Sequence, residues 1–321
     1  MATSMLDLFR VLSAFAPGRV DLKDAPWEPY VDWAIAQGLA PLAAYNLEYR
    51  LGHCGAPQWA KDRLLSIFQG TANDNVMKLV NFKRSVDDLE GRRIALLGAG
   101  SFAESLYPHV AWRPVIDLRL LVPPRDVDPL VSWLRRAEFK PDESTAAPSG
   151  ERVLSDTRTL IFVHGTLLND PAHDAAMLAR AHKLKVYGPS MLRLDLEDSL
   201  LTQALLMARA GFEVPMLEFI DLRELVLGAP SMGGDYSREP RADELLARAK
   251  TYGVERALWA ALGVVERLFP ETEQAVARLR PSLMLPTREL LTRLVVTPLS
   301  EVGRMEAFRG EDTLRQLLTG G

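Results

Sequence analysis

A glycine-rich segment and a strand with one carboxylate are the parts of this chain best suited to chemistry. The segment GAGS at 98–101 follows the apolar run IALL. A strand, a glycine turn and a helix in this order commonly bring backbone N–H groups close to a phosphate. Downstream, VIDLRLLV carries Asp117 and Arg119, and strand alternation puts both side chains on one face. We therefore expect a phosphate-bearing ligand near these residues.

The chain divides into three regions that differ in the spacing of their apolar residues, and the second region contains these residues. Residues 1–91 have apolar side chains at three- and four-residue spacing, which predicts an N-terminal helical region. Residues 92–188 contain the strand signals RRIALLG, VIDLRLLV and TRTLIFVHG, which predict a small α/β core. Helical spacing returns over 189–321, with one long helix predicted at 241–269. The expected fold class is α+β and mostly helical, with a C-terminal helical region after the core.

Composition argues against several classes of protein. The 321 residues are 48% hydrophobic and 25% charged, which predicts a folded globular chain. A formal charge of −4 without a Lys/Arg run predicts no nucleic-acid partner. The single cysteine, Cys54, excludes an internal disulfide and a cysteine-rich zinc site. No apolar run approaches the roughly 18 residues of a membrane span, so we expect a cytoplasmic protein with no membrane partner.

Two nucleotide-binding folds are compatible with the glycine segment. The spacing G-x-G-x-x-A over 98–103 matches a dinucleotide fingerprint, which needs an acid about twenty residues on, at the end of the next strand. Asp117 lies inside its strand, and Asp126 lies beyond two prolines. Only one further strand signal follows, too few for a doubly wound sheet. The alternative is a polymerase-β-like nucleotidyltransferase core, in which the next strand carries a carboxylate.

Several short segments support this second fold. Leu106-Tyr107 is followed by RPVIDLRLLV at 113–122, and then come WLRRAEF and FVH at 162–164. The acidic run DLED opens a helix at 195–198, and IDL follows at 220–222. In these segments, residues 93–228 resemble the bacterial family of uncharacterised nucleotidyltransferases of the polymerase-β-like superfamily. The family has R-x-x-x-D-x-D-x-L-V where this chain has RPVIDLRLLV.

The resemblance implies nucleotidyl transfer, in which carboxylates hold two divalent cations that clamp a triphosphate. The family takes these carboxylates from D-x-D and from the neighbouring strand. This chain keeps Asp117 but has Arg119 and Phe162 at the other two positions, and Leu97 replaces a family lysine. One carboxylate beside a guanidinium is a poor Mg²⁺ site. We therefore expect a catalytically degenerate protein without a metal site, in which Arg119 pairs with Asp117.

The candidate site residues have three roles. Asp117 is the catalytic remnant, and Phe162 and His164 line the cleft. The residues expected to contact a nucleotide are Gly98, Gly100, Ser101, Arg113 and Arg119. Structural alternatives stay open for three of these side chains: a helix N-cap for Ser101, a loop brace for Arg113 and a satisfied buried histidine for His164.

Three hypotheses for function remain open. The first is a degenerate nucleotidyltransferase-like protein that binds a nucleoside triphosphate or a protein partner and needs no cofactor. The second is an active Mg²⁺-dependent transferase with carboxylates relocated to Glu104, Asp126 or Asp156, which we otherwise expect to be solvated charges. The third is a helical interaction protein in which the α/β core is only a scaffold.

Overall fold

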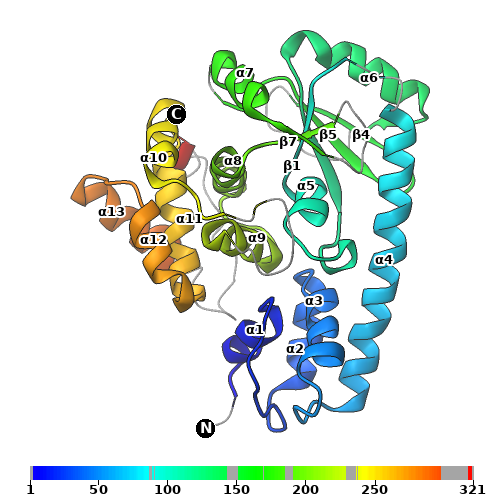
Figure 1. The fold of residues 1–321 in the computed structure, drawn as a ribbon, viewed down its shortest axis with the longest axis vertical. Helices are drawn as coiled ribbons and strands as arrows, with labels where there is room; N and C mark the ends of the chain where they lie inside the picture. Colours follow the sequence, from blue (N-terminus) through cyan, green and yellow to red (C-terminus); the bar gives the residue numbers. More distant parts are fainter. Residues whose placement is uncertain are drawn as a thin grey trace.

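A mixed sheet flanked by helices forms the centre of the chain in a computed structural model (Figure 1). The predicted α+β, mostly helical fold class is confirmed. The structure describes residues 3–86, 89, 91–142, 151–168, 170–184, 191–228, 236, 238–297 and 317–319. Most of the predicted loop KPDESTAAPSGE, at 143–150, lies outside the described residues. Within the described part, no helix combines the length and apolar character needed to cross a membrane.

The sheet has the strand order β3-β4-β5-β2-β1-β7-β6. Strand β1 pairs antiparallel with β2, whereas β2 pairs parallel with β5 and β1 pairs parallel with β7. Because the dinucleotide fold begins with parallel β1 and β2, this antiparallel pair rules that fold out. The strands are β1 (Ile94–Leu97), β2 (Asp117–Leu121), β3 (Lys140–Pro141), β4 (Arg152–Ser155), β5 (Leu160–His164), β6 (His182–Lys183) and β7 (Met191–Arg193).

Four of these strands were not predicted. The missed strands β3, β4, β6 and β7 are two to four residues long, too short to show an alternating pattern. Strand β7 pairs with β1 although it lies beyond residue 188, the predicted end of the core. The division at residues 91 and 188 stays a prediction.

Helices make up most of the chain before β1 and after β7. The N-terminal helices are α1 (Met5–Ser13), α2 (Trp27–Ala36), α3 (Ala40–Tyr45) and α4 (Gln58–Val86). Helix α1 begins with a capping box between Ser4 and Asp7. The core carries α5 (Gly98–Ser105), α6 (Val127–Arg136) and α7 (Pro171–Arg180). The C-terminal helices are α8 (Leu196–Arg209), α9 (Met216–Leu227), α10 (Ala242–Tyr252), α11 (Glu255–Leu268), α12 (Glu273–Leu279) and α13 (Leu285–Leu291).

The single helix predicted at 241–269 is wrong. It is two helices, α10 and α11, divided at Gly253, which adopts a left-handed conformation with φ of 70°. The N–H of Val254 donates to the carbonyl of Ala249, which closes the end of α10. The apolar stripe hides this break, because its spacing continues across the glycine.

Two hydrophobic clusters hold the layers together. One cluster joins both helical ends of the chain to the sheet. In this cluster the ring centres of Phe9 in α1 and Phe269, just after α11, are 5.4 Å apart. Arg10 adds a hydrogen bond of 2.7 Å to the carbonyl of Leu268. The other cluster packs α6 and the end of α4 against the sheet. The first and last helical regions therefore share one core.

Helix α4 also holds the segment that leads into β2. Its Asn75 side chain donates to the carbonyls of Val110 and Arg113 and accepts from the N–H of Val115. The ammonium of Lys78 donates to the Val115 carbonyl at 2.8 Å. Both side chains are buried, so these bonds replace contacts with water. A distant helix thereby fixes the start of the strand that carries Asp117.

We expect Asn75→Ala to lower the free energy of unfolding by about 2–3 kcal/mol, because buried carbonyls and a buried N–H lose their partner. Urea denaturation measures this loss. The matched control is Gln274→Ala, which removes an exposed amide side chain on α12 and should change stability by less than about 0.5 kcal/mol. Equal effects for the two variants would contradict this role for Asn75.

Candidate functional site

A cavity of about 300 Å³ lies where the sheet meets the helices of both ends. Gly38, Gly98, Asp117, Arg119 and Glu218 are among its lining residues. A larger hollow of about 940 Å³ lies between the C-terminal ends of α4 and α6, away from these side chains. We take the smaller cavity as the candidate site, because converging polar groups mark a binding site better than size does.

Asp117 and Arg119 form the ion pair that strand alternation predicts. The Arg119 guanidinium donates to Asp117 Oδ2 through Nε at 3.2 Å and Nη2 at 3.1 Å. Parallel pairing of β2 with β5 sets Arg119 beside Phe162, and the guanidinium lies 5.1 Å from the centre of that ring. Asp117, Arg119 and Phe162 therefore converge, as the sequence analysis expected, and they bring together an acid, a cation and an aromatic ring.

The charge of Arg119 is stabilised by acids on two elements. Burial lowers the pKa of its guanidinium, but Asp117 and Glu218 outweigh that effect and the net shift is upward. The Arg119 cation is therefore a permanent part of the cavity wall.

These donors do not fit a Mg²⁺ ion, which needs several oxygen ligands. In the part of the chain that the structure describes, no three His, Cys, Asp or Glu side chains are placed to hold a metal. The proposed relocated carboxylates do not line the cavity. Asp126 pairs with Arg92 at 2.5 Å, and Asp156 accepts hydrogen bonds from the N–H groups of the turn before β5. Glu104 is half-buried on α5, and burial raises its pKa.

Arg113 is bound to a buried acid. Its Nη2 lies 2.6 Å from Asp221 Oδ2, and both side chains are almost fully buried. The hydroxyl of Tyr107 donates to the other oxygen of Asp221 at 2.7 Å. Arg113 also donates to the carbonyl of Pro114. This geometry is the structural brace considered for Arg113, although the side chain also lines the cavity.

The glycine segment is the first turn of α5. Gly98 begins the helix with φ of +53°, and a Cβ there would point toward Gln203 Oε1 across the cavity. Gly100 is buried, and a Cβ there would lie 2.8 Å from Leu118 Cδ2, so this glycine lets α5 approach β2 closely. Nucleotide contact by these glycines stays a prediction.

The N-cap alternative for Ser101 is wrong. Leu97 occupies the N-cap position, and Ser101 lies within the helix. Its buried hydroxyl has no hydrogen-bond partner among the described residues. A phosphate contact by Ser101 stays a prediction.

His164 lies at the end of β5 and is buried. Its Nδ1 is 3.1 Å from Glu151 Oε1, a partner that the sequence analysis missed. Glu151 precedes β4, and pairing of Arg152 with Val163 sets it beside His164. Neither ring nitrogen makes a hydrogen bond with the described residues, so the nearby carboxylate does not make His164 the satisfied buried histidine considered above.

Sequence analysis also missed the acids on the helical side of the cavity. Glu213 and Glu218 line it, and Gln203 of α8 donates to Glu218 Oε2 at 3.0 Å. Burial raises the pKa of Glu218 despite the nearby arginines Arg113 and Arg119. Glu218 lies three residues before Asp221, so both face the same side of α9. The IDL segment was the available signal for this helix.

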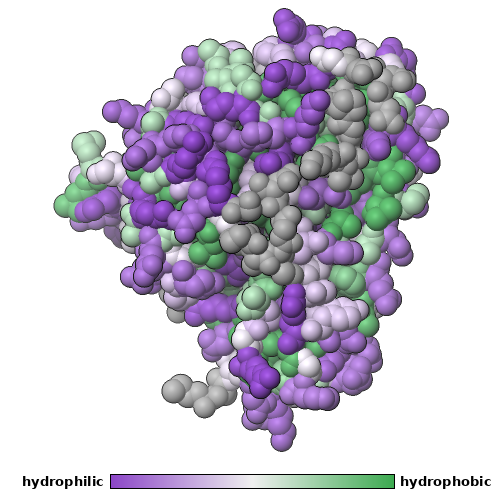
Figure 2. Space-filling model, in the orientation of Figure 1, coloured by the Kyte–Doolittle hydropathy of each residue, from purple (hydrophilic) through white to green (hydrophobic). Residues whose placement is uncertain are grey.

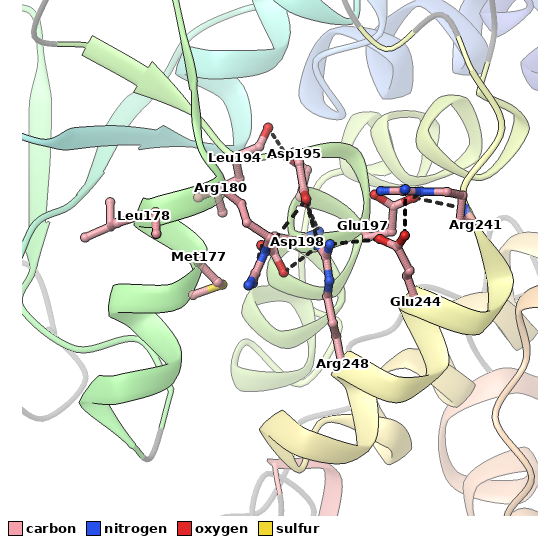
Figure 3. Close-up of polar contacts among 12 residues, drawn as sticks. Met177, Leu178, Arg180, Leu194, Asp195, Glu197, Asp198, Arg241, Glu244 and Arg248 are labelled. Carbon is pink, nitrogen blue, oxygen red and sulfur yellow. Dashed lines mark hydrogen bonds and ion pairs between the residues drawn. The ribbon is translucent and has the colours of Figure 1, made fainter.

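The acidic run at the start of α8 is buried in a cluster of arginines (Figure 3). Asp195 caps the helix by accepting from the N–H of Asp198 at 2.8 Å. Arg180 of α7 and Arg248 of α10 both bind Asp198, at 2.8 and 3.2 Å. Since Arg180 belongs to α7 and Arg248 to α10, the cluster fastens α10 to the core.

Glu197 makes a second set of contacts in this cluster. Arg238 binds its two oxygens at 2.5 and 2.6 Å, and the N–H of Arg241 donates at 2.9 Å. Burial raises the pKa of Glu197, but these hydrogen bonds outweigh burial and lower it to about 2. The acidic run at 195–198 therefore joins neighbouring segments through arginines, and it does not line the cavity.

A family model described as Uncharacterised nucleotidyltransferase matches residues 23–270, which extend from before α2 through α11. No curated protein matches the chain. The family match therefore includes the cavity and the arginine cluster.

We expect Glu197→Gln to lower the free energy of unfolding at pH 7 by about 1–2 kcal/mol, after allowance for solvent screening of Arg238. Because the folded pKa is depressed, the stabilisation is present above pH 4.5 and is lost as the pH falls toward about 2. Urea denaturation at pH 7 and pH 3 should therefore show a smaller difference between variant and wild type at pH 3. The exposed control Glu273→Gln should show no such change.

Proposed function

Because this chain belongs to the family of uncharacterised nucleotidyltransferases, we propose that its core binds a ligand without transferring a nucleotidyl group. The observation that carries this proposal is the ion pair of Arg119 with Asp117 beside the Phe162 ring. Nucleotidyl transfer needs carboxylates at these positions, and two of the three are replaced. The protein is a nucleotidyltransferase-like pseudoenzyme.

The proposed ligand is a nucleotide, bound through Arg119. This arginine and Asp117 are both partly exposed, so their pairing contributes little and is exchangeable. A phosphate is a stronger partner, since it offers a guanidinium two oxygens and more charge. Arg113 is less suited to this role, because leaving Asp221 would strand a buried charge. Gly98 lines the same cavity, and the backbone N–H groups at the start of α5 are available there to a phosphate.

An active transferase is a second candidate, favoured by one observation. Glu213 and Glu218 line the same cavity as Asp117, so carboxyl groups other than those expected lie near the remnant acid. This candidate requires Mg²⁺ or Mn²⁺ for triphosphate binding, whereas binding through Arg119 does not. Metal dependence therefore separates the two.

We expect isothermal titration to show binding of one of ATP, GTP, CTP or UTP equally with and without Mg²⁺. Arg119→Ala should weaken that binding at least about 10-fold, because one charge-assisted hydrogen-bonding partner is lost. Arg125→Ala, an exposed arginine outside the cavity, is the matched control and should bind as wild type does. Binding only with Mg²⁺ would favour the active transferase. No binding of any of the four would favour the scaffold hypothesis.

The double variant Arg119→Asp with Phe162→Asp tests the lost metal site directly. These positions are neighbours across β2 and β5, so the variant places three carboxylates together. We expect nucleotide affinity to become Mg²⁺-dependent. Arg119→Asn with Phe162→Asn is the uncharged control. Identical behaviour of the two double variants would contradict the assignment of this strand pair as a former metal site.

A further inference from the structure

The outer face of α4 exposes large apolar side chains. Trp59, Ile67, Val76, Met77 and Val80 are each at least 36% exposed. Figure 2 shows apolar surface along the edge of the molecule where Figure 1 places the upper part of α4. Three of these residues, at 76, 77 and 80, are adjacent on the helix surface. A contiguous apolar patch on a helix face is typical of an interaction surface.

Charge is nearly absent from this face. Between Leu64 and Phe82 the charged residues are Asp74 and Lys78, which pair with each other at 2.7 Å. The exposed residues of that stretch are Ser66, Ile67, Gln69, Gly70, Asn73, Val76, Met77 and Val80. Surface helices normally carry charged residues on their outer side. The face is therefore suited to contact with protein more than with water.

Gly70 gives a second, independent indication. It lies exposed within α4, where a glycine costs about 1 kcal/mol of stability relative to alanine. A Cβ at this position would meet nothing within 4 Å in the chain. Packing within this chain therefore does not require the glycine. Close approach of a second backbone explains it.

We propose that this face joins two copies of the chain, with their α4 helices antiparallel about a two-fold axis near Asn73. The two halves of the face are complementary in size. One half contains the small residues Ser66 and Gly70, and the other contains the larger Val76 and Val80. Antiparallel pairing about Asn73 sets Val76 of one copy over Gly70 of the other, and it sets Val80 over Ser66. A C2 interface requires this kind of self-complementarity.

The charges at the ends of α4 suit the same arrangement. Asp62 lies near the N-terminal end, and Lys83 and Arg84 lie exposed near the C-terminal end. Antiparallel pairing brings the acid of one copy to the basic end of the other. Arg63, which would otherwise oppose this contact, is bound to Asp32 at 2.7 Å. The interface uses no residue of the cavity, so it is independent of nucleotide binding.

Sedimentation velocity across a range of concentrations tests this interface. The wild type should be a dimer, and Met77→Glu with Val80→Glu should raise the dimer dissociation constant at least about 100-fold, because buried like charges face an apolar surface. The control is Met284→Glu with Leu290→Glu, which alters two exposed apolar residues near and on α13 and should leave the dimer intact. Circular dichroism checks that each variant is folded.

A cysteine at the two-fold axis gives a second readout. Asn73→Cys should form a disulfide-linked dimer on mild oxidation, because residue 73 of one copy faces residue 73 of the other across the axis. The exposed control Ser282→Cys should form no such dimer. The native Cys54 is buried and does not compete. A monomeric wild type would overturn the proposal. A dimer that persists in the Met77→Glu, Val80→Glu variant, or no disulfide at residue 73, would also overturn it.

Discussion

The buried contact of Arg113 with Asp221 connects the sheet to the C-terminal helices. Both side chains are almost fully buried, so each charge needs the other, and the hydroxyl of Tyr107 donates to a further oxygen of Asp221. The contact fixes α9 against the segment that enters β2, and this segment is also held by Asn75 of α4. The cavity lies between these elements. The shape of the cavity therefore depends on this buried charged pair.

Pairing of charges is the common feature of this protein. Arg119 binds Asp117 in the cavity, and the acids that begin α8 are bound by arginines of α7 and α10. In a nucleotidyltransferase, carboxylates of this kind would hold cations that neutralise a triphosphate. In this chain the acids of both clusters are paired with guanidinium groups. Membership of the family thus coexists with a cavity in which Asp117 is already paired with an arginine.

Sequence analysis predicted the parts of the site that lie on β2. The family, the fold class and the pairing of Asp117 with Arg119 all followed from short motifs and strand alternation. Sequence analysis failed where a strand was too short to show alternation, and where helical apolar spacing continued across a break between two helices. The strands of two to four residues were missed, and α10 and α11 were merged because their apolar spacing continues across Gly253.

Local patterns thus gave the family and one wall of the cavity, because alternation on a strand depends only on neighbouring residues. The remaining wall depends on contacts between distant segments. Asp221 lies 108 positions from Arg113, and Gln203 and Glu218 come from two C-terminal helices. Only packing of those helices on the sheet shows that Arg113 is buried against Asp221, whereas Arg119 stays partly exposed beside Asp117. Burial and distance, which no short motif encodes, therefore distinguish the two arginines.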